Sequence, residues 1–267
     1  MAPPVTIALV LVGMHGYLGS HVVKRGVIFV DIALAQVAAF GVAVSLFFGA
    51  EIGTDTAFTA GLVSTLLGAL LLSGTRTRDE KVPQEAYIGI VYVVFSAAMI
   101  LVLTQVPHGG EEIRHLLVGA ILWVTWPVVL KTAILYAALG ALLFFLHSRL
   151  HRISVNPEQA RQDGMSLARW DFFFYLVLGT VVTSSVQIAG VLLVFTLLIV
   201  PTVMGIRLFT QERKQFLYVL GTGTGAVVVG ATASYVLDLP TGAAIVCTFG
   251  IFLAIQIIGE RLLRSCS

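Results

Sequence analysis

Hydrophobic positions along the chain gather into long runs that short polar segments separate. A helix needs about 20 apolar residues to cross the hydrocarbon core of a bilayer. Runs of roughly that length cover residues 4–23, 27–49, 56–74, 84–105, 116–148, 170–189, 190–208, 216–237 and 242–260. The pattern therefore predicts an all-α polytopic membrane protein with about nine transmembrane helices.

The run 116–148 is too long for one straight helix. Pro127 within it lacks the backbone N–H that a continuing helix needs. We therefore expect a short helix from Glu111 to about Trp123, followed by a full span from about Val128.

The runs 170–189 and 190–208 are continuous in hydropathy, so their boundary depends on one residue. Gly190 is the expected hinge of a tight helical hairpin, because glycine adopts backbone conformations that other residues avoid. A chain with eight spans would result if one of the weak boundaries, such as this one, were absent.

The composition agrees with a membrane protein. Of the 267 residues, 58% are hydrophobic and 11% are charged, whereas a soluble domain carries about 25% charged residues. The formal net charge of +2 is too small to indicate a nucleic-acid partner. Membrane lipid is the expected surrounding of the chain.

The distribution of basic residues predicts the orientation, because cytoplasmic loops hold the excess of Lys and Arg. With the N-terminus outside, the cytoplasmic loops contain all but Arg114 and Lys131 of the 16 Lys and Arg residues. These are Lys24, Arg25, Arg76, Arg78, Lys81, Arg149, Arg152, Arg161, Arg169, Arg207, Arg213, Lys214, Arg261 and Arg264. We therefore expect the N-terminus outside and the C-terminus in the cytoplasm.

The longest cytoplasmic loop contains the signals of a short polar helix. Asn156 can cap it, Pro157 suits its first position, and Gln159 completes a capping box. Gly164 is a natural C-terminal stop. Because isolated helices shorter than about 12–15 residues are marginally stable, this one must pack either on its own bundle or in a groove on a cytoplasmic partner.

A carboxylate and an amide stand inside the predicted span 27–49. Asp31 lies about one turn from its cytoplasmic end, where it could be a helix-start acid near Lys24 and Arg25. Gln36 lies deeper, and that interpretation leaves it unexplained. The alternative places Asp31 on a translocation pathway with Gln36 beside it, since acids in spans usually face a bundle interior or a cavity.

His15 lies midway along the first predicted span. An ionisable group at that depth is a functional candidate, so His15 could be a ligand on the pathway if the first two spans are neighbours. The alternative is a neutral histidine that is hydrogen-bonded to a backbone carbonyl.

Other polar residues have more ordinary interpretations. Glu111, Glu112 and His115 lie at the predicted outer mouth, where they could attract a cation or form a solvated rim. The hydroxyls of Thr183–Ser185 and the amides of Gln187 and Gln256 are expected to join helices to one another.

Segments along nearly the whole chain resemble the permease subunits of bacterial zinc/manganese ABC importers. The similar segments are 24–44, 116–130, 155–173, 189–208 and 234–246, in the same order as in that family. The resemblance implies a type II ABC-importer permease architecture, a single transmembrane permease domain over residues 1–267, and a functional homodimer.

The resemblance also implies the activity and the partners. Such a permease moves zinc, manganese or iron across the bacterial inner membrane, with a cargo that an extracellular or periplasmic metal-binding protein delivers. ATP is hydrolysed on separate cytoplasmic ABC ATPase subunits, so the chain is not expected to be an enzyme or to bind a cofactor. The absence of a Walker A motif agrees.

In this family the loop helix couples the ATPase to the spans. The resemblance places that coupling helix at about 156–165 here, with Asn156, Pro157, Glu158, Arg161 and Gly164 in it.

The chain departs from the family in its second span. The family has an Asp followed four residues later by a His, which places both on one helix face. Here Ala35 follows Asp31 at that spacing, and Gln36 comes next. Two alternatives to a metal-ion importer therefore remain: an ABC permease for a metal chelate, and a secondary transporter in which Asp31 couples transport to a proton or sodium gradient.

Overall fold

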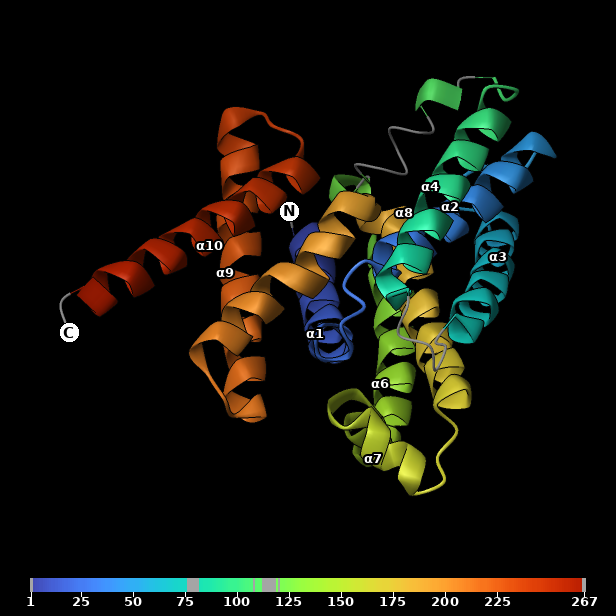
Figure 1. The fold of residues 1–267 in the computed structure, drawn as a ribbon. Coiled ribbons are helices and arrows are strands. Elements are labelled where there is room, and N and C mark those ends of the chain that lie inside the picture. Colours follow the sequence, from blue (N-terminus) through green and yellow to red (C-terminus); the bar gives the residue numbers. More distant parts are fainter. Residues whose placement is uncertain (1, 76–81, 108, 112–118, 120, 266–267) are drawn as a thin grey trace.

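The computed structural model describes residues 2–75, 82–107, 109–111, 119 and 121–265, and this part of the chain is almost entirely helical. Figure 1 shows the arrangement. The elements are α1 (Ala2–Arg25), α2 (Val30–Phe47), α3 (Asp55–Gly74), α4 (Gln84–Leu103), the 3-10 turn η1 (Ile121–Trp123), α6 (Trp126–Val155), α7 (Pro157–Gln162), α8 (Leu167–Leu208), α9 (Glu212–Leu237) and α10 (Thr241–Ser265).

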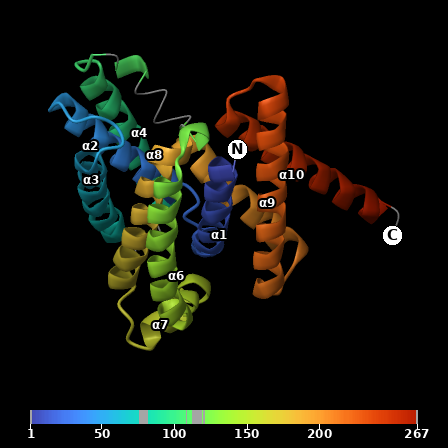
Figure 2. The ribbon, with the colours of Figure 1, turned by 180° about the vertical axis from the view of Figure 1, so that it is seen from behind.

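Among the described residues, 8 helices are long and apolar enough to cross a membrane. The predicted runs 170–189 and 190–208 form the two halves of α8. At Gly190 the backbone is not helical (φ 75°, ψ 159°), and the two halves point in different directions in both views (Figures 1 and 2). The predicted change of direction at Gly190 is therefore confirmed, and α8 contains both of the predicted runs.

α6 begins at Trp126, with Pro127 in its first turn, where the missing N–H costs no hydrogen bond. The predicted break before Val128 is confirmed. The helix runs on to Val155, beyond the predicted end at residue 148. Its 30 residues span about 45 Å, more than the hydrocarbon thickness of about 30 Å. Most of the short helix predicted over 111–123 lies outside the described residues.

α8 lies at the centre of the bundle and packs against α1, α2, α3, α9 and α10. Three consecutive hydroxyls of α8 each reach a different helix, because successive residues point about 100° apart. Their hydrogen bonds are Thr183–Thr65 of α3 (2.9 Å), Ser184–Tyr136 of α6 (3.1 Å) and Ser185–His15 of α1 (3.2 Å). The predicted role of these residues in joining helices is confirmed.

Gln256 of α10 joins helices in the same way. Its side chain accepts a hydrogen bond from the Tyr218 hydroxyl of α9 at 3.1 Å and donates one to the Met204 carbonyl of α8 at 3.1 Å. These bonds satisfy an amide that would otherwise be costly in an apolar setting. Gln187 of α8 differs, because its side-chain nitrogen is buried without a hydrogen-bond partner among the described residues.

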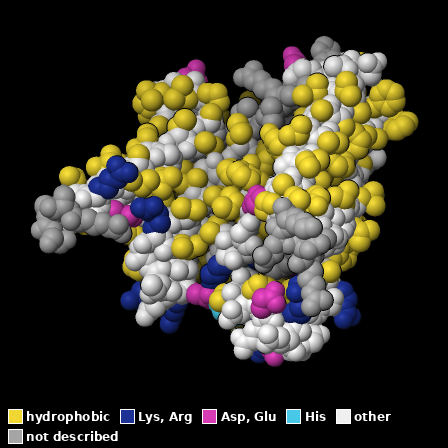
Figure 3. Space-filling model, in the orientation of Figure 1, with side chains coloured by type: hydrophobic (Ala, Val, Ile, Leu, Met, Phe, Trp, Pro, Cys, Tyr) yellow, Lys and Arg dark blue, Asp and Glu magenta, His cyan; other side chains and the backbone are white. Residues whose placement is uncertain are grey.

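Hydrophobic side chains cover most of the face shown in Figure 3, whereas Lys and Arg gather mainly toward its lower side, where α7 lies. Large apolar side chains of α3, α4 and α6 are exposed, among them Leu67, Val93 and Phe145, which is 81% exposed. A surface of this kind is suited to lipid tails or to another membrane-embedded chain.

Candidate functional site

Asp31 is a buried acid in the first turn of α2. The turn Val27–Phe29 precedes it, and α2 begins at Val30. Only 1% of Asp31 is exposed, and neither carboxylate oxygen has a hydrogen-bond partner among the described residues. The positive end of the α2 dipole stabilises a negative charge on Asp31 only partly. An acid that is desolvated in this way needs a counter-charge or a proton.

A second acid, which the sequence analysis did not single out, faces the same region. Glu85 lies in the first turn of α4, and α4 packs along α2. One Glu85 oxygen accepts a hydrogen bond from the backbone N–H of Ile28, while the other is buried without a partner. The two carboxylates are close enough for Glu85 to repel a charge on Asp31.

No ion pair joins Asp31 or Glu85 to another residue in the described part of the chain. Two neighbouring carboxylates without a cation cannot both stay ionised cheaply. A cation between the two acids, or a proton on Asp31, would relieve this repulsion.

Gln36 is also buried, 3% exposed, and its side-chain oxygen has no partner among the described residues. It follows Asp31 by five residues, so the two side chains leave α2 about 140° apart. α2 alone therefore does not bring them to one ion. Gln36 stays a predicted pathway residue.

His15 is fully buried on α1, and both of its ring nitrogens have partners. Nδ1 lies 2.9 Å from the Leu11 carbonyl oxygen, and Nε2 lies 3.2 Å from the Ser185 hydroxyl. α1 packs mainly on α8, α6 and α9, whereas α2 packs on α3, α4 and α8. The first two spans are thus not principal packing partners, which supports the alternative of a neutral histidine that joins helices.

The predicted outer mouth lies mostly outside the described residues. Glu111 is described and is exposed. Glu112 and His115 lie outside the described residues, so their proposed role stays a prediction.

The predicted loop helix forms as α7 and begins at Pro157 as expected, but the predicted capping bonds are absent. The Asn156 side chain makes no capping bond to the backbone; its amide lies 3.5 Å from the Gln159 side-chain oxygen instead. The expected capping box is therefore wrong. The stop is confirmed: Gly164 is left-handed (φ 78°), and the Met165 N–H donates to the Ala160 carbonyl at 3.0 Å.

α7 is anchored on one face and open on the other. Ala160 is fully buried against Ile153 of α6 and Leu167 of α8. Its polar residues are exposed, and an ion pair of 3.6 Å joins Glu158 to Arg161. The helix therefore packs on its own bundle while it presents a charged surface to any partner.

A buried polar network joins the chain segments on either side of α7. Arg25, at the end of α1, forms an ion pair of 2.5 Å with Asp171 near the start of α8, and both side chains are at most 2% exposed. Arg25 Nε also donates to the Ser154 hydroxyl near the end of α6 at 3.0 Å. The guanidinium lies 4.2 Å from the ring centre of Phe174. The ends of three helices are thus held together at the base of α7.

Comparisons with known proteins identify the chain's relatives. Residues 1–259 match the ABC 3 transport family. The chain is 26% identical over 241 residues to the manganese transport system membrane protein MntC of Listeria innocua. The matched region covers 90% of this chain and 84% of that protein. It is 22% identical over 255 residues to a probable iron transport system membrane protein of Haemophilus influenzae, with 96% and 92% covered.

Two solved structures share the fold. PsaBC from Streptococcus pneumoniae, in complex with Fab, superposes with a TM-score of 0.80 at 22% identity, covering 96% of this chain and 90% of that one. A transporter assigned to the metal-chelate type, in an inward-facing conformation, gives a TM-score of 0.73 at 20% identity, covering 97% and 85%.

Proposed function

The chain belongs to the ABC 3 transport family, and we propose that it is the permease subunit of an ATP-driven importer for a divalent metal ion. Relatives named for manganese and iron transport support the metal cargo. The family match and the description of these relatives as membrane proteins of transport systems support the permease role.

The pair of acids, buried Asp31 on α2 and half-buried Glu85 on α4, is the observation that carries the metal proposal. A divalent cation would neutralise both carboxylates and give a partner to both Asp31 oxygens and to the one Glu85 oxygen that has none. Once bound in the dimer pathway, the ion would be shielded from lipid by the surrounding helices.

The ligand types favour a hard cation. Carboxylate and amide oxygens suit Mn²⁺, whereas imidazole suits Zn²⁺ better. The position that holds histidine in the family is Ala35 here, and the nearby Gln36 offers only an amide oxygen. We therefore expect manganese, or iron in its divalent state, to be preferred over zinc.

Transport needs an energy source that this chain does not carry, so cytoplasmic ABC ATPases are the proposed partners of α7. Two copies of the chain would form the pathway, and an extracellular or periplasmic protein would deliver the metal. Glu158 and Arg161 would contact the ATPase from the exposed face of α7, with Asn156, Pro157 and Gly164 fixing its ends. The Arg25 network would pass the movement of α7 to α1, α6 and α8.

The proposed setting is the bacterial inner membrane, with the N-terminus outside. In this orientation α7 and the ends of α1 and α6 face the cytoplasm. Secondary transport with Asp31 as the coupling acid is the alternative, and membership of an ABC family argues against it.

Uptake by an Asp31→Asn variant tests the proposal. The chain is expressed with its ATPase and binding protein in cells that lack their own manganese importers, and uptake of ⁵⁴Mn²⁺ is measured. Asp31→Asn keeps the shape of the side chain but removes the charge, so uptake should fall to the level of cells without the chain. The assembled complex should still be recovered.

Asp55→Asn is the matched control. Asp55 is exposed and pairs at 3.0 Å with Lys131, so its loss should leave uptake unchanged. If Asp31→Asn is expressed normally and takes up manganese as the parent does, Asp31 is only a charge at the end of a helix and has no role in transport.

A further inference from the structure

A cavity at the cytoplasmic end of the bundle contains a cluster of metal-binding side chains that the proposed transport pathway does not use. Its volume is about 600 Å³, and it lies between α1, α6 and α9. His21, His147, His151 and Glu212 contribute to its lining. Three imidazoles and a carboxylate at one cavity are an unusual concentration for a chain with 6 histidines.

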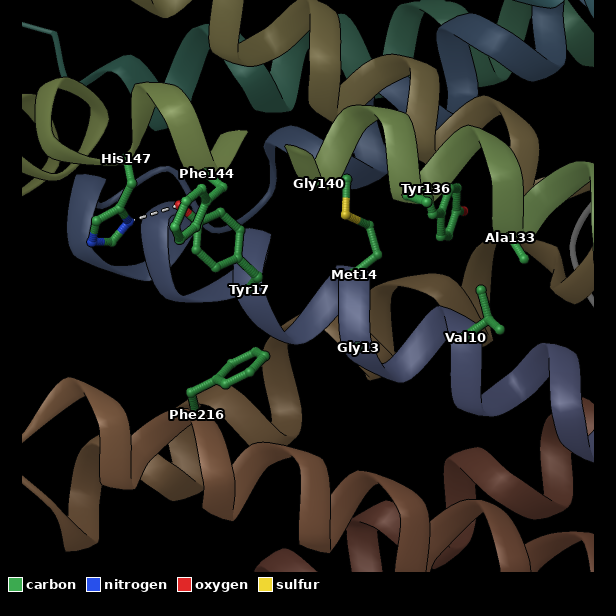
Figure 4. Close-up of a pocket in the computed structure, with 11 residues that line it drawn as sticks. Val10, Gly13, Met14, Tyr17, Ala133, Tyr136, Gly140, Phe144, His147 and Phe216 are labelled. Carbon is green, nitrogen blue, oxygen red and sulfur yellow. Dashed lines mark hydrogen bonds between the residues drawn. The ribbon is translucent and has the colours of Figure 1, made fainter. Parts of the chain in front are cut away.

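A second, mostly apolar cavity of about 440 Å³ adjoins it along α1 and α6. The two cavities share Tyr17, Phe144, His147 and Phe216 in their walls. Figure 4 shows this second cavity, with His147 at one end, hydrogen-bonded to Tyr17, and Phe216 of α9 across the space. His147 therefore stands where an apolar groove meets the polar cavity.

Three of the polar residues are arranged as metal ligands. His147 and His151 are four residues apart on α6, so they share one helix face, and their ring centres lie 5.8 Å apart. Glu212 is the first residue of α9. One ligand atom from each of the three lies within 4.8 Å of the others. Bonds of about 2.1 Å at tetrahedral angles require ligand atoms about 3.4 Å apart, so small side-chain rotations would close the site.

The contacts that His147 and His151 make leave ring nitrogens available to bind a metal. His151 Nδ1 is 3.2 Å from a Glu212 oxygen, yet this nitrogen has no hydrogen-bond partner among the described residues. His147 Nδ1 is 2.9 Å from the Tyr17 hydroxyl. If His147 Nε2 binds a metal, Nδ1 must carry the proton. The Tyr17 hydroxyl oxygen is placed to accept a hydrogen bond from that N–H. A partner of this kind orients a metal-bound imidazole.

Lys24 supplies the positive charge beside this cluster in the present structure. Its ammonium forms a short ion pair with Glu212. The long side chain can turn toward water, so a divalent ion would compete with it for the carboxylate.

We propose that His147, His151 and Glu212 form a binding site for a divalent first-row transition metal ion, separate from Asp31 of α2 and Glu85 of α4. Two imidazoles and one carboxylate are a ligand set that zinc, iron, cobalt and manganese ions accept. The bound ion would join α6 to the start of α9 across the cavity. Because α7 follows α6 within a few residues, such a bridge would hold the base of the proposed coupling element in place.

Metal binding by the purified chain tests this site independently of transport. The chain, with a histidine-free affinity tag, is placed in lipid nanodiscs and carries Asp31→Asn and Glu85→Gln, which remove the two acids of the proposed transport pathway. Titration with Co²⁺ should give one ion per chain, with visible absorption bands that report nitrogen ligands. X-ray absorption of the Zn²⁺ form should show two imidazole nitrogens at about 2.0–2.1 Å.

Three variants decide the result. His147→Gln combined with His151→Gln should remove the bound ion. Lys24→Gln should raise the affinity about two- to fivefold, because the competing ion pair is partly exposed and worth little. Glu260→Gln, which alters a carboxylate paired with Arg207 instead, should bind as the parent does.

No bound ion in the acid-free parent would overturn the site, as would binding that survives the loss of both histidines. Neither result would affect the transport proposal, which depends on the uptake of the Asp31→Asn variant in cells.

Discussion

Replacing Asp171 with leucine should destabilise the chain, because it leaves the Arg25 guanidinium buried without this carboxylate. The side chain of Arg25 is 2% exposed and that of Asp171 is 0% exposed. Removing one partner of a buried ion pair costs about 3–5 kcal/mol. The Ser154 hydroxyl and the Phe174 ring still contact the guanidinium, so the lower part of that range is expected for Asp171→Leu.

The reverse change, Arg25→Met, should cost about 3–5 kcal/mol as well, since it leaves a buried carboxylate. The double variant removes both charges and fills their place with apolar side chains of similar volume. Such replacements are often neutral or stabilising. The double variant should therefore be more stable than either single variant, with a coupling energy of about 3 kcal/mol or more.

Reversible unfolding in mixed detergent measures these differences, with helix content followed by circular dichroism. The matched control is the pair Arg152–Asp163, at 3.0 Å, whose side chains are 57% and 46% exposed. Its cycle of Arg152→Met and Asp163→Leu should give about 1 kcal/mol or less. If the costs of the Arg25 and Asp171 variants simply add, the network does not hold the base of α7.

Three further predictions concern coupling, metal choice and orientation. Gly164→Val forces a β-branched residue into a left-handed conformation (φ 78°) at a cost of about 1–3 kcal/mol, so ATP hydrolysis should continue while uptake per ATP falls; parental uptake per ATP would remove the coupling role. Gln36→His should shift the uptake preference from manganese toward zinc, measured by competition between the two ions, and an unchanged ratio would place Gln36 off the pathway. Reporter fusions after Thr77 and Ser154 should report the cytoplasm and one after Thr54 the outside; a cytoplasmic signal at Thr54 would reverse the orientation.

Features that depend on local backbone chemistry could be predicted from the sequence. Gly190 marks the change of direction in α8, Pro127 lies in the first turn of α6, and Gly164 ends α7. Each residue acts through its own φ or its own missing N–H, so no knowledge of the packing is needed. The capping box at Asn156 failed because the side chain turns to Gln159 instead of the backbone.

Features that depend on contacts between distant segments could not be predicted. The ion pair of Arg25 with Asp171 spans 146 residues, and the contact of Glu85 with Ile28 spans 57. The sequence presents Arg25 as an ordinary cytoplasmic charge and Glu85 as an ordinary helix-start acid. The helical spacing of His147 and His151 is visible in the sequence, but nothing there brings Glu212 beside them. Only the packing of the helices in three dimensions reveals these partners.

ATP-dependent uptake by the purified components tests the central claim most directly. The chain, its ATPase and its metal-binding protein are reconstituted in proteoliposomes, and ⁵⁴Mn²⁺ accumulation is followed with ATP on the ATPase side. The account predicts uptake that needs ATP, the ATPase and the binding protein together, and that Asp31→Asn abolishes. Accumulation driven by a proton or sodium gradient, without ATPase or ATP, would contradict it and identify a secondary transporter.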